Sequence, residues 1–358
     1  MTQPALGLLA SAIVMAIALG FISLFDFGTF AGWVAFVMLG LIPMQVVAVV
    51  LWGANPSFAS GLRQPVKGVV LVLVTIVATA VISPLVFMTV GEGMAPPGPI
   101  PSHYVIIVVP TTFWLAIMMG GWPFNRISSN PVVVGLAALL AAYVVTYAIF
   151  RVFFNYDFLQ GAPVYLQSAP RGMFNGVSAL VFYVTALAVM FLVLCFDLWP
   201  LTSFPAIMKQ PVLGIVWTVI ALAGAALAMS VGVVRPGADP MAFLTQVTVP
   251  FIFGSIIVLN MLQNSLFARM KQPLKGVMNT IAAAAIGLIL AHLYVSLAPI
   301  VIGQLASGPP GYEREIWLAN ALLSVTFPFL IYYAVFFGYW PLVREQQPAA
   351  AARRQTAM

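Results

Sequence analysis

The sequence predicts an all-α, polytopic integral membrane protein with ten transmembrane helices, built as five parallel copies of a two-helix unit. Three observations predict this class. The 358 residues are 63% hydrophobic and only 6% charged, with a mean hydropathy of +1.08, whereas soluble domains carry roughly 25% charged residues. Apolar runs of about 20 residues, long enough to cross the ~30 Å hydrocarbon core as helices, recur along the chain. A short phrase, "QPALG" at its first occurrence, precedes every second run.

The phrase sets the boundaries of the units. It begins at Gln3, Gln64, Asn130, Gln210 and Gln272, at spacings of 61, 66, 80 and 62 residues. Such regularity indicates a repeated supersecondary unit. Proline suits the first turn of a helix, a preceding Gln or Asn can bond free backbone donors, and the following glycine lets a neighbouring helix approach closely. Ligand binding by the phrase is the alternative. The predicted units cover about 3–63, 64–129, 130–209, 210–271 and 272–346.

Each unit is expected to contain a first helix and a returning second helix. The second helices resemble one another: "PTTFWLAIMMGGWPFNR" at 110–126 aligns without a gap on "PFLIYYAVFFGYWPLVR" at 328–344. The expected first helices are about 4–25, 65–90, 131–154, 211–233 and 273–297. The expected second helices are about 30–53, 104–122, 175–199, 244–267 and 316–340.

Charge near the helix ends predicts the orientation. Four basic residues, Arg151, Arg171, Arg235 and Arg314, fall on one side. By the positive-inside rule, the other side and both termini are cytoplasmic, in a bacterial-type inner membrane. Because each unit has two spans, all copies point the same way. One transmembrane domain is expected over 1–345, with a disordered cytoplasmic tail at 346–358. The remaining ten basic residues are Arg63, Lys67, Arg126, Lys209, Arg269, Lys271, Lys275, Arg344, Arg353 and Arg354.

Prolines in the middle of the second helices are the first candidate pathway residues. They are Pro43, Pro110, Pro250 and Pro328, and the third unit lacks one. Each removes a backbone donor and kinks or opens the helix. Polar residues lie close by, among them Gln45 and Thr112. Broken helices near the midplane build substrate sites in many transporters, although prolines also serve as plain kinks.

A second candidate set appears when the first helices are aligned on their prolines. Nineteen residues after the proline come Ser23, Ser230 and His292, and Arg151 takes the matching place in the third unit. At 1.5 Å per residue these positions lie nearly 30 Å from the cytoplasmic end. They are expected to ring an outer vestibule that favours an anion or a dipolar solute. Snorkelling of Arg151 and His292 to the interface is the alternative.

Polar residues also occur toward the cytoplasmic end. Asn260 and Asn279 would line an inner gate or form an amide network between helices. Asp197 replaces a glycine found in the second and fifth units and is a candidate for proton coupling, with pairing to a nearby Lys or Arg as the alternative.

Enzyme and cofactor signatures are weak. The single cysteine, Cys195, excludes a disulfide within the chain and a thiol metal cluster. No hydrolase, zinc-protease or phosphate-loop motif is present, and no basic surface with interleaved aromatics favours nucleic acid. His103 and His292 would hold a haem only if their helices were adjacent.

The sequence therefore predicts a non-enzymatic permease or channel, without a cofactor, for a small solute: an anion, a zwitterion or a small polar molecule. The lipid bilayer is its surroundings, and association with another copy or with partner membrane subunits is left open. The alternative is a non-catalytic or haem-holding membrane subunit of a larger complex.

Overall fold

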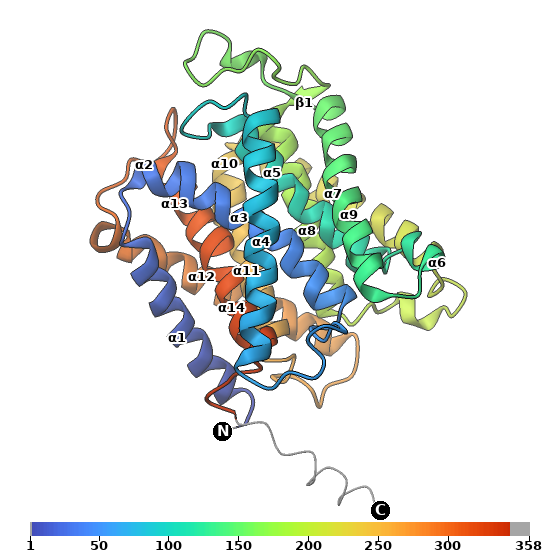
Figure 1. The fold of residues 1–358 in the computed structure, drawn as a ribbon. Coiled ribbons are helices and arrows are strands. Elements are labelled where there is room, and N and C mark those ends of the chain that lie inside the picture. Colours follow the sequence, from blue (N-terminus) through green and yellow to red (C-terminus); the bar gives the residue numbers. More distant parts are fainter. Residues whose placement is uncertain (1, 344–358) are drawn as a thin grey trace, which may run out of the picture.

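The computed structural model describes residues 2–343. Ten of its helical segments are long and apolar enough to cross a membrane, which confirms the ten-helix, all-α prediction. The described chain begins and ends at the same end of the bundle, which we call the terminal end (Figure 1). The opposite end is called the loop end. The predicted tail at 346–358, and with it Arg344, Arg353 and Arg354, lies outside the described residues.

Five segments form an outer set and five an inner set. In the outer set 28–39% of residues are buried, against 50–72% in the inner set. The alternation follows the sequence, because every helix that begins after a Gln–Pro or Asn–Pro phrase is outer. The outer helices are α1 (Ala5–Ile22), α4 (Val66–Thr89), α7 (Pro131–Phe153), α9 with η6 (Val212–Met229 and Ser230–Val234) and α12 (Leu274–Val301).

The inner helices mix α-helical and π-helical turns. The first comprises α2 (Phe27–Thr29), η1 (Phe30–Val34), α3 (Ala35–Val46) and η2 (Val47–Leu51). The second comprises α5 (Pro99–Phe113) and η3 (Trp114–Met118), and the third is α8 (Gly176–Cys195). The fourth comprises α10 (Pro240–Phe243), η7 (Leu244–Thr248), α11 (Val249–Ile256) and η8 (Ile257–Met261). The fifth comprises α13 (Glu313–Ala319), η9 (Asn320–Thr326), α14 (Phe327–Ile331) and η10 (Tyr332–Phe336).

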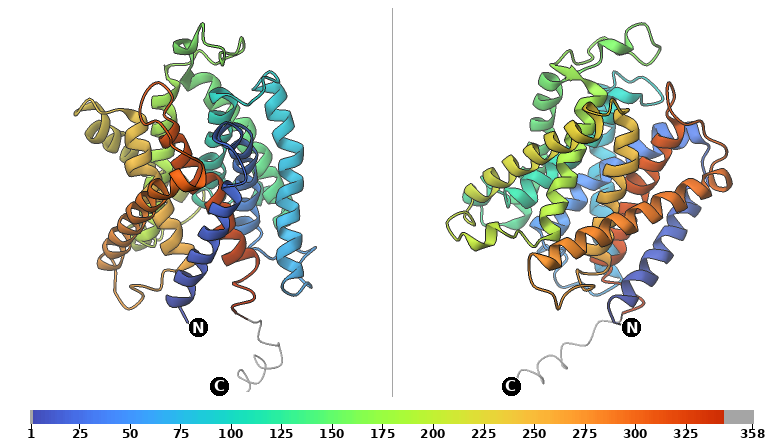
Figure 2. Two further views of the ribbon diagram at one scale, coloured as in Figure 1. Left: turned by 90° about the vertical axis from the view of Figure 1, so that its left-hand side faces the viewer. Right: turned by 180° about the vertical axis from the view of Figure 1, so that it is seen from behind.

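The inner helices form a closed ring. Along the ring α3 packs on α5, α5 on α8, α8 on α11, α11 on η9, and η9 with α14 returns to α3. Figure 2 shows the outer helices α1 and α12 crossing the bundle obliquely. Each inner helix therefore has two inner neighbours.

Each outer helix covers a groove of this ring. It packs on the inner helix just before it in the chain and on the end of the one before that. Thus α7 contacts α5 and η2, and α9 contacts α8 and η3. The rule continues across the chain ends, because α1 contacts α14 and η9 of the fifth inner helix and η8 of the fourth. The same pairing holds for α4 with α3 and η10, and for α12 with α11 and α8.

The Gln–Pro phrase joins the two sets at the terminal end. Gln3 accepts from the Gly7 amide through Oε1 at 3.2 Å and donates from Nε2 to the Met261 carbonyl at 3.1 Å. Gln64 and Gln210 make the same pair of bonds, to Phe336 and Met118. A Cβ on Gly7 would overlap the Met261 carbonyl oxygen. The phrase is thus a clamp between helices, as its structural interpretation expects.

All five inner helices stop at a pair of residues in the left-handed region, two residues after the last helical one. Glycine leads the pair in three, at Gly53, Gly120 and Gly338, and accepts this backbone without a Cβ clash. Asp197 and Gln263 lead the other two. The inner helices end earlier than expected, at 51, 118, 195, 261 and 336 rather than 53, 122, 199, 267 and 340, because this turn stops each of them.

The loop end carries the remaining difference from an all-helical prediction. A two-residue parallel ladder joins β1 (Phe154–Asn155) to β2 (Phe174–Asn175), on either side of the long loop 156–173. Some expected loop residues are helical, since the second inner helix begins at Pro99 and α12 runs on to Val301. The short helices are α6 (Phe124–Ile127), η4 (Asp157–Leu159) and η5 (Leu201–Ser203).

Candidate functional site in the inner ring

Three of the four prolines in the inner helices lie at the same distance before the turn that ends their helix. Pro43, Pro110 and Pro328 each lie ten residues before the leading left-handed residue and four before a π-helical segment, η2, η3 and η10. Pro250 lies thirteen residues before Gln263. A missing N–H breaks the regular bonding of the helix, and π turns often accompany such breaks at functional sites. The helix without a proline, α8, is regular throughout.

Buried polar side chains lie next to these breaks. Gln45 is fully buried and donates from Nε2 to the Pro328 carbonyl at 2.9 Å, joining the first and fifth inner helices. Its Oε1 has no hydrogen-bond partner. Thr185 and Thr248 join the third and fourth inner helices at 3.2 Å. Thr112 is buried but donates to Val108 of its own helix.

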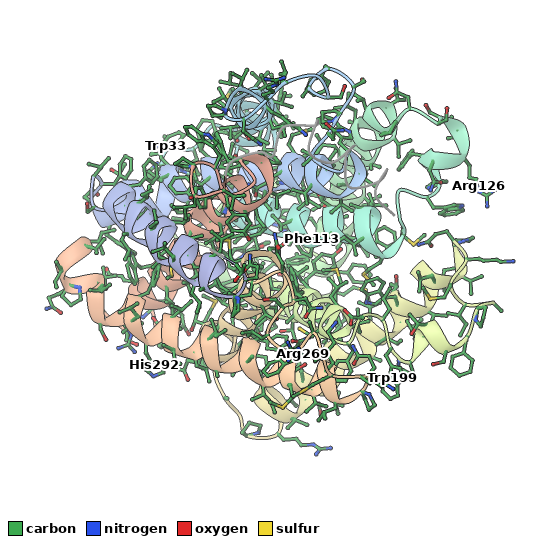
Figure 3. The ribbon with its side chains drawn as sticks, turned by 90° about the horizontal axis from the view of Figure 1, so that it is seen from below. Trp33, Phe113, Arg126, Trp199, Arg269 and His292 are labelled. Atoms are coloured by element: carbon green, nitrogen blue, oxygen red, sulfur yellow. The ribbon has the colours of Figure 1, made fainter. Side chains whose placement is uncertain are left out.

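Aromatic rings close the centre of the ring. Viewed along the bundle, Phe113 lies in the middle of the molecule (Figure 3). Its ring meets Phe191 of α8 with centroids 5.6 Å apart, and Phe327 of the fifth inner helix with centroids 6.5 Å apart. All three are buried hydrophobic residues. Three inner helices therefore meet at this group of buried rings, which we call the constriction.

The charged cluster at the terminal end of α8 is a second polar centre. Asp197 accepts from Lys275 Nζ at 2.7 Å, from Gln272 Nε2 at 3.0 Å and from Asn264 Nδ2 at 3.0 Å. Buried Asn279 donates to the Asn264 side chain at 2.7 Å and to the Cys195 carbonyl. Asp197 is thus ion-paired, which is the alternative that the sequence left open for it. Asn260 stays apart and donates to Ile256 of its own helix.

The four candidate residues on the first helices lie on the outer set. Ser23, Arg151 and His292 are exposed, and Ser230 is half-buried. Ser23 donates to Gly20 of its own helix, and His292 Nδ1 lies 2.8 Å from the Leu288 carbonyl. His292 also lines a cavity of about 420 Å³ with Arg314 and Glu315. These residues have different neighbours, and the structure does not bring them together around the centre of the ring.

Arg151 holds the long loop at the loop end. It donates to the Ser168 carbonyl at 2.6 Å, and the Ser168 amide donates to Glu92 Oε1 at 2.6 Å. The bonds from Ser168 lower the pKa of Glu92, because they favour the charged carboxylate. We call Arg151, Ser168 and Glu92 the loop clasp. Glu92 was not among the residues predicted to be functional.

The two histidines have separate environments. His103, near the start of α5, lies 2.9 Å from the Tyr156 hydroxyl through Nδ1, whereas His292 lies on α12 beside Arg314. Burial raises the pKa of Tyr156 well above its usual value, so the phenol stays protonated. No hydrogen bond or ring contact joins the two histidines among residues 2–343. This arrangement offers the haem hypothesis no support.

Comparisons with known proteins assign no function to the chain. No family model, no curated protein and no solved structure matches the chain. Within the described part of the chain, no group of three or more His, Cys, Asp or Glu could hold a metal ion.

The aromatic residues of the constriction were not among the predicted candidates. Polar residues stand out in so apolar a chain, whereas aromatic residues are common throughout it. A signal was available, because Phe113 follows Pro110 by three residues and Phe327 directly precedes Pro328. A large ring thus lies next to a helix break in two of the second helices.

Proposed function

We propose that the chain is a channel or permease that moves a small polar solute across a bacterial-type inner membrane, with both termini in the cytoplasm. Its ten helices are five parallel copies of a two-helix unit around an axis along the membrane normal. The solute is an anion, a zwitterion or a small polar molecule.

Packing and end geometry support the repeat. Each outer helix contacts the inner helices one and two steps before it, and this rule closes through α1. Each inner helix also ends in the same left-handed pair. A chain of unrelated hairpins has no reason to obey one contact rule five times.

The closed inner ring is the observation that carries the functional proposal. Four of its five helices are broken by proline, and buried polar groups lie beside the breaks. Irregular backbone and polar side chains are tolerated at membrane depth where they line a cavity or bury against protein. Phe113, Phe191 and Phe327 close this path in the described conformation.

Charge along the inner helices favours passive movement. Between residues 104 and 118, and throughout 27–51, 176–195 and 240–261, the inner helices carry no Asp, Glu, Lys, Arg or His. The fifth has its Glu313, Arg314 and Glu315 at the loop end. Within residues 2–343, Asp197 is the one acid near the terminal end of the ring, and it is neutralised by Lys275. The middle of the path thus lacks a carboxylate or imidazole that could carry a proton through it.

Solute flux in proteoliposomes tests the proposal. A Phe113→Ala variant opens the constriction and is expected to raise flux at least about tenfold, which corresponds to a barrier lower by about 1.4 kcal/mol. The screen covers small anions, zwitterions and neutral solutes. Phe150→Ala is the control, since Phe150 is also buried but lies on outer helix α7. If folded Phe113→Ala protein moves none of these solutes faster than Phe150→Ala, the function is wrong.

A further inference from the structure

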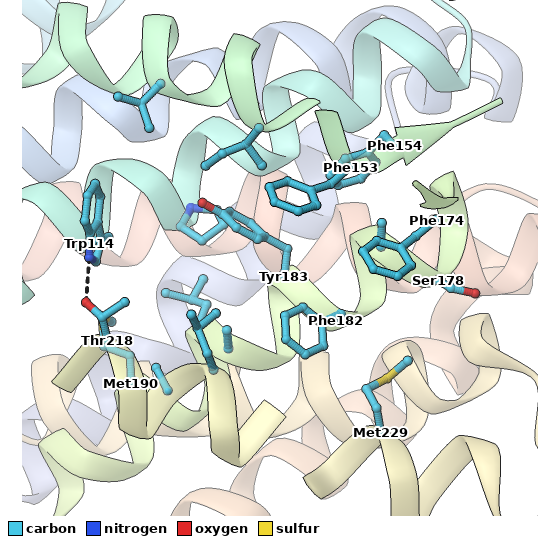
Figure 4. Close-up of a pocket in the computed structure, with 18 of the residues that line it drawn as sticks. Trp114, Phe153, Phe154, Phe174, Ser178, Phe182, Tyr183, Met190, Thr218 and Met229 are labelled. Atoms are coloured by element: carbon cyan, nitrogen blue, oxygen red, sulfur yellow. Dashed lines mark hydrogen bonds between the residues drawn. The ribbon is translucent and has the colours of Figure 1, made fainter. Parts of the chain in front are cut away.

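A lateral slot opens on the outside of the ring, between outer helices α7 and α9. It is a cavity of about 660 Å³ whose floor is formed by α8 and η3 (Figure 4). The side of α7 that lines it is a stripe at every fourth residue, Val145, Ile149 and Phe153. Small residues on the opposite helices, Ala186 and Ala221 among them, leave the space unfilled.

The slot has the depth of one lipid leaflet. On α8 its lining runs from Ser178, two residues after the helix starts at the loop end, to Met190. Twelve residues of helix rise about 18 Å. Half of the ~30 Å hydrocarbon core is about 15 Å. The slot therefore begins at the interface of the loop end and reaches just past the bilayer centre.

The polar atoms deep in the slot are already paired. The Trp114 indole donates to Thr218 at 2.8 Å, and Thr218 donates to the Gly214 carbonyl at 2.6 Å. The Tyr183 hydroxyl lies 3.1 Å from Thr111 Oγ1. A water in this part of the slot would find few partners, so an apolar occupant is favoured. The volume lies within the 300–1,000 Å³ typical of ligand sites.

The rim indicates which apolar occupant fits. Phe153, Phe174 and Leu222 are 41%, 54% and 42% exposed at the mouth. Helices of two membrane proteins associate closely through small residues, and these bulky side chains hold a second helix away. In a bilayer, lipid chains would face the mouth over its whole depth, because the slot spans about one leaflet.

We propose that the lateral slot binds one acyl chain of a phospholipid in the leaflet at the loop end. The bound chain lies along α8, with its methyl end near Trp114 and Met190. It fills the space that the side chains leave between α7 and α9, and it contacts the second inner helix at Pro110. The proposal is independent of what the ring transports.

Quenching of Trp114 by brominated lipid tests the site. The full chain is reconstituted in nanodiscs of phosphatidylcholine with or without bromine on the acyl chains. The emission that disappears in a Trp114→Phe variant isolates the Trp114 signal. That signal is expected to lose most of its intensity in brominated lipid. In Ala186→Phe protein, whose new ring occupies the slot, this loss is expected to be largely abolished.

Two further variants make the result decisive. Ala179→Leu fills the slot less drastically and keeps the test available if Ala186→Phe fails to fold. Ala226→Phe, on an exposed face of α9 outside the slot, is the control and should quench like the wild type. Equal Trp114 emission in both lipids would overturn the proposal. So would a dimer by light scattering that Ala186→Phe converts to monomer, because a second copy would then cover the slot.

Discussion

The third inner helix, α8, differs from the other four in three respects. It has no mid-helix proline and is α-helical throughout, whereas the others are interrupted by π turns. At its end Gln272 bonds the Asp197 carboxylate, where Gln3, Gln64 and Gln210 bond a backbone carbonyl. The lateral slot also lies along α8.

The shared end turn does not depend on the proline. All five inner helices reach the same left-handed pair, with or without a break upstream. The break has a different effect, because it interrupts backbone bonding at the depth of Gln45, Thr112 and Phe113. The proposed path thus depends on the four broken helices, while α8 supplies a straight wall and the ring of Phe191.

Placing a proline in α8 is the strongest way to challenge this division. Leu187 lies ten residues before Asp197 and corresponds to Pro110. Because α8 is a regular helix, Leu187→Pro removes a helical bond and clashes with the preceding turn, which costs about 3 kcal/mol or more. The expected result is a large fall in the thermal unfolding midpoint in detergent. Pro110→Leu is the counterpart and should shift the midpoint less. Equal shifts would mean that α8 is no different from its neighbours.

Removing a glutamine clamp at the terminal end is expected to lower stability by an intermediate amount. Gln210→Ala leaves the Met118 carbonyl and the Gly214 amide without these partners, at about 1–3 kcal/mol. Gln272→Ala should cost less, since Asp197 keeps Lys275 and Asn264. Unfolding midpoints of the two variants, measured side by side, check the order. A larger loss for Gln272→Ala would show that the carboxylate cluster depends on the glutamine.

Loss of the loop clasp, which precedes α8, is expected to have the smallest effect on stability. That effect depends on pH. The pKa of Glu92 is lowered from its usual 4.5 in the folded chain, so the clasp stabilises the loop above that value and is lost as pH falls below it. Limited proteolysis of loop 156–173 should accelerate in acid. In the Glu92→Gln variant, the loop should be cleaved at every pH at the faster rate that the wild type shows in acid, because the amide cannot titrate. A wild-type rate that stays flat through this range would exclude a role for Glu92.

Much of the fold could be predicted from sequence because it follows local rules. Apolar length predicted the ten helices, and Pro4 and its counterparts predicted where the first helix of each unit starts. The inner and outer sets could not be assigned from the sequence, since the first and second helices of the units are almost equally apolar. The pairing of α7 with η2 also has no local signal, because those segments lie about eighty residues apart in the chain and meet only in the closed ring.

The candidate residues also differ in whether their surroundings follow from the local sequence or only from the fold. Pro43, Pro110, Pro250 and Pro328 are visible in sequence because a proline acts on its own helix. Arg151 was visible as a charge near the membrane, but its partner could not be inferred because Ser168 is placed by the fold of a long loop. Phe113 was overlooked among 26 phenylalanines.

Water access to the centre of the ring tests the central claim most directly. In a Cys195→Ser background, which removes the only native thiol, a cysteine is placed at Gln45 or Thr112 and exposed to a small charged thiol reagent. The account predicts slow labelling with Phe113 in place and rapid labelling when Phe113→Ala is added. Labelling that stays slow at both positions in the folded double variants would mean that no path runs through the inner helices.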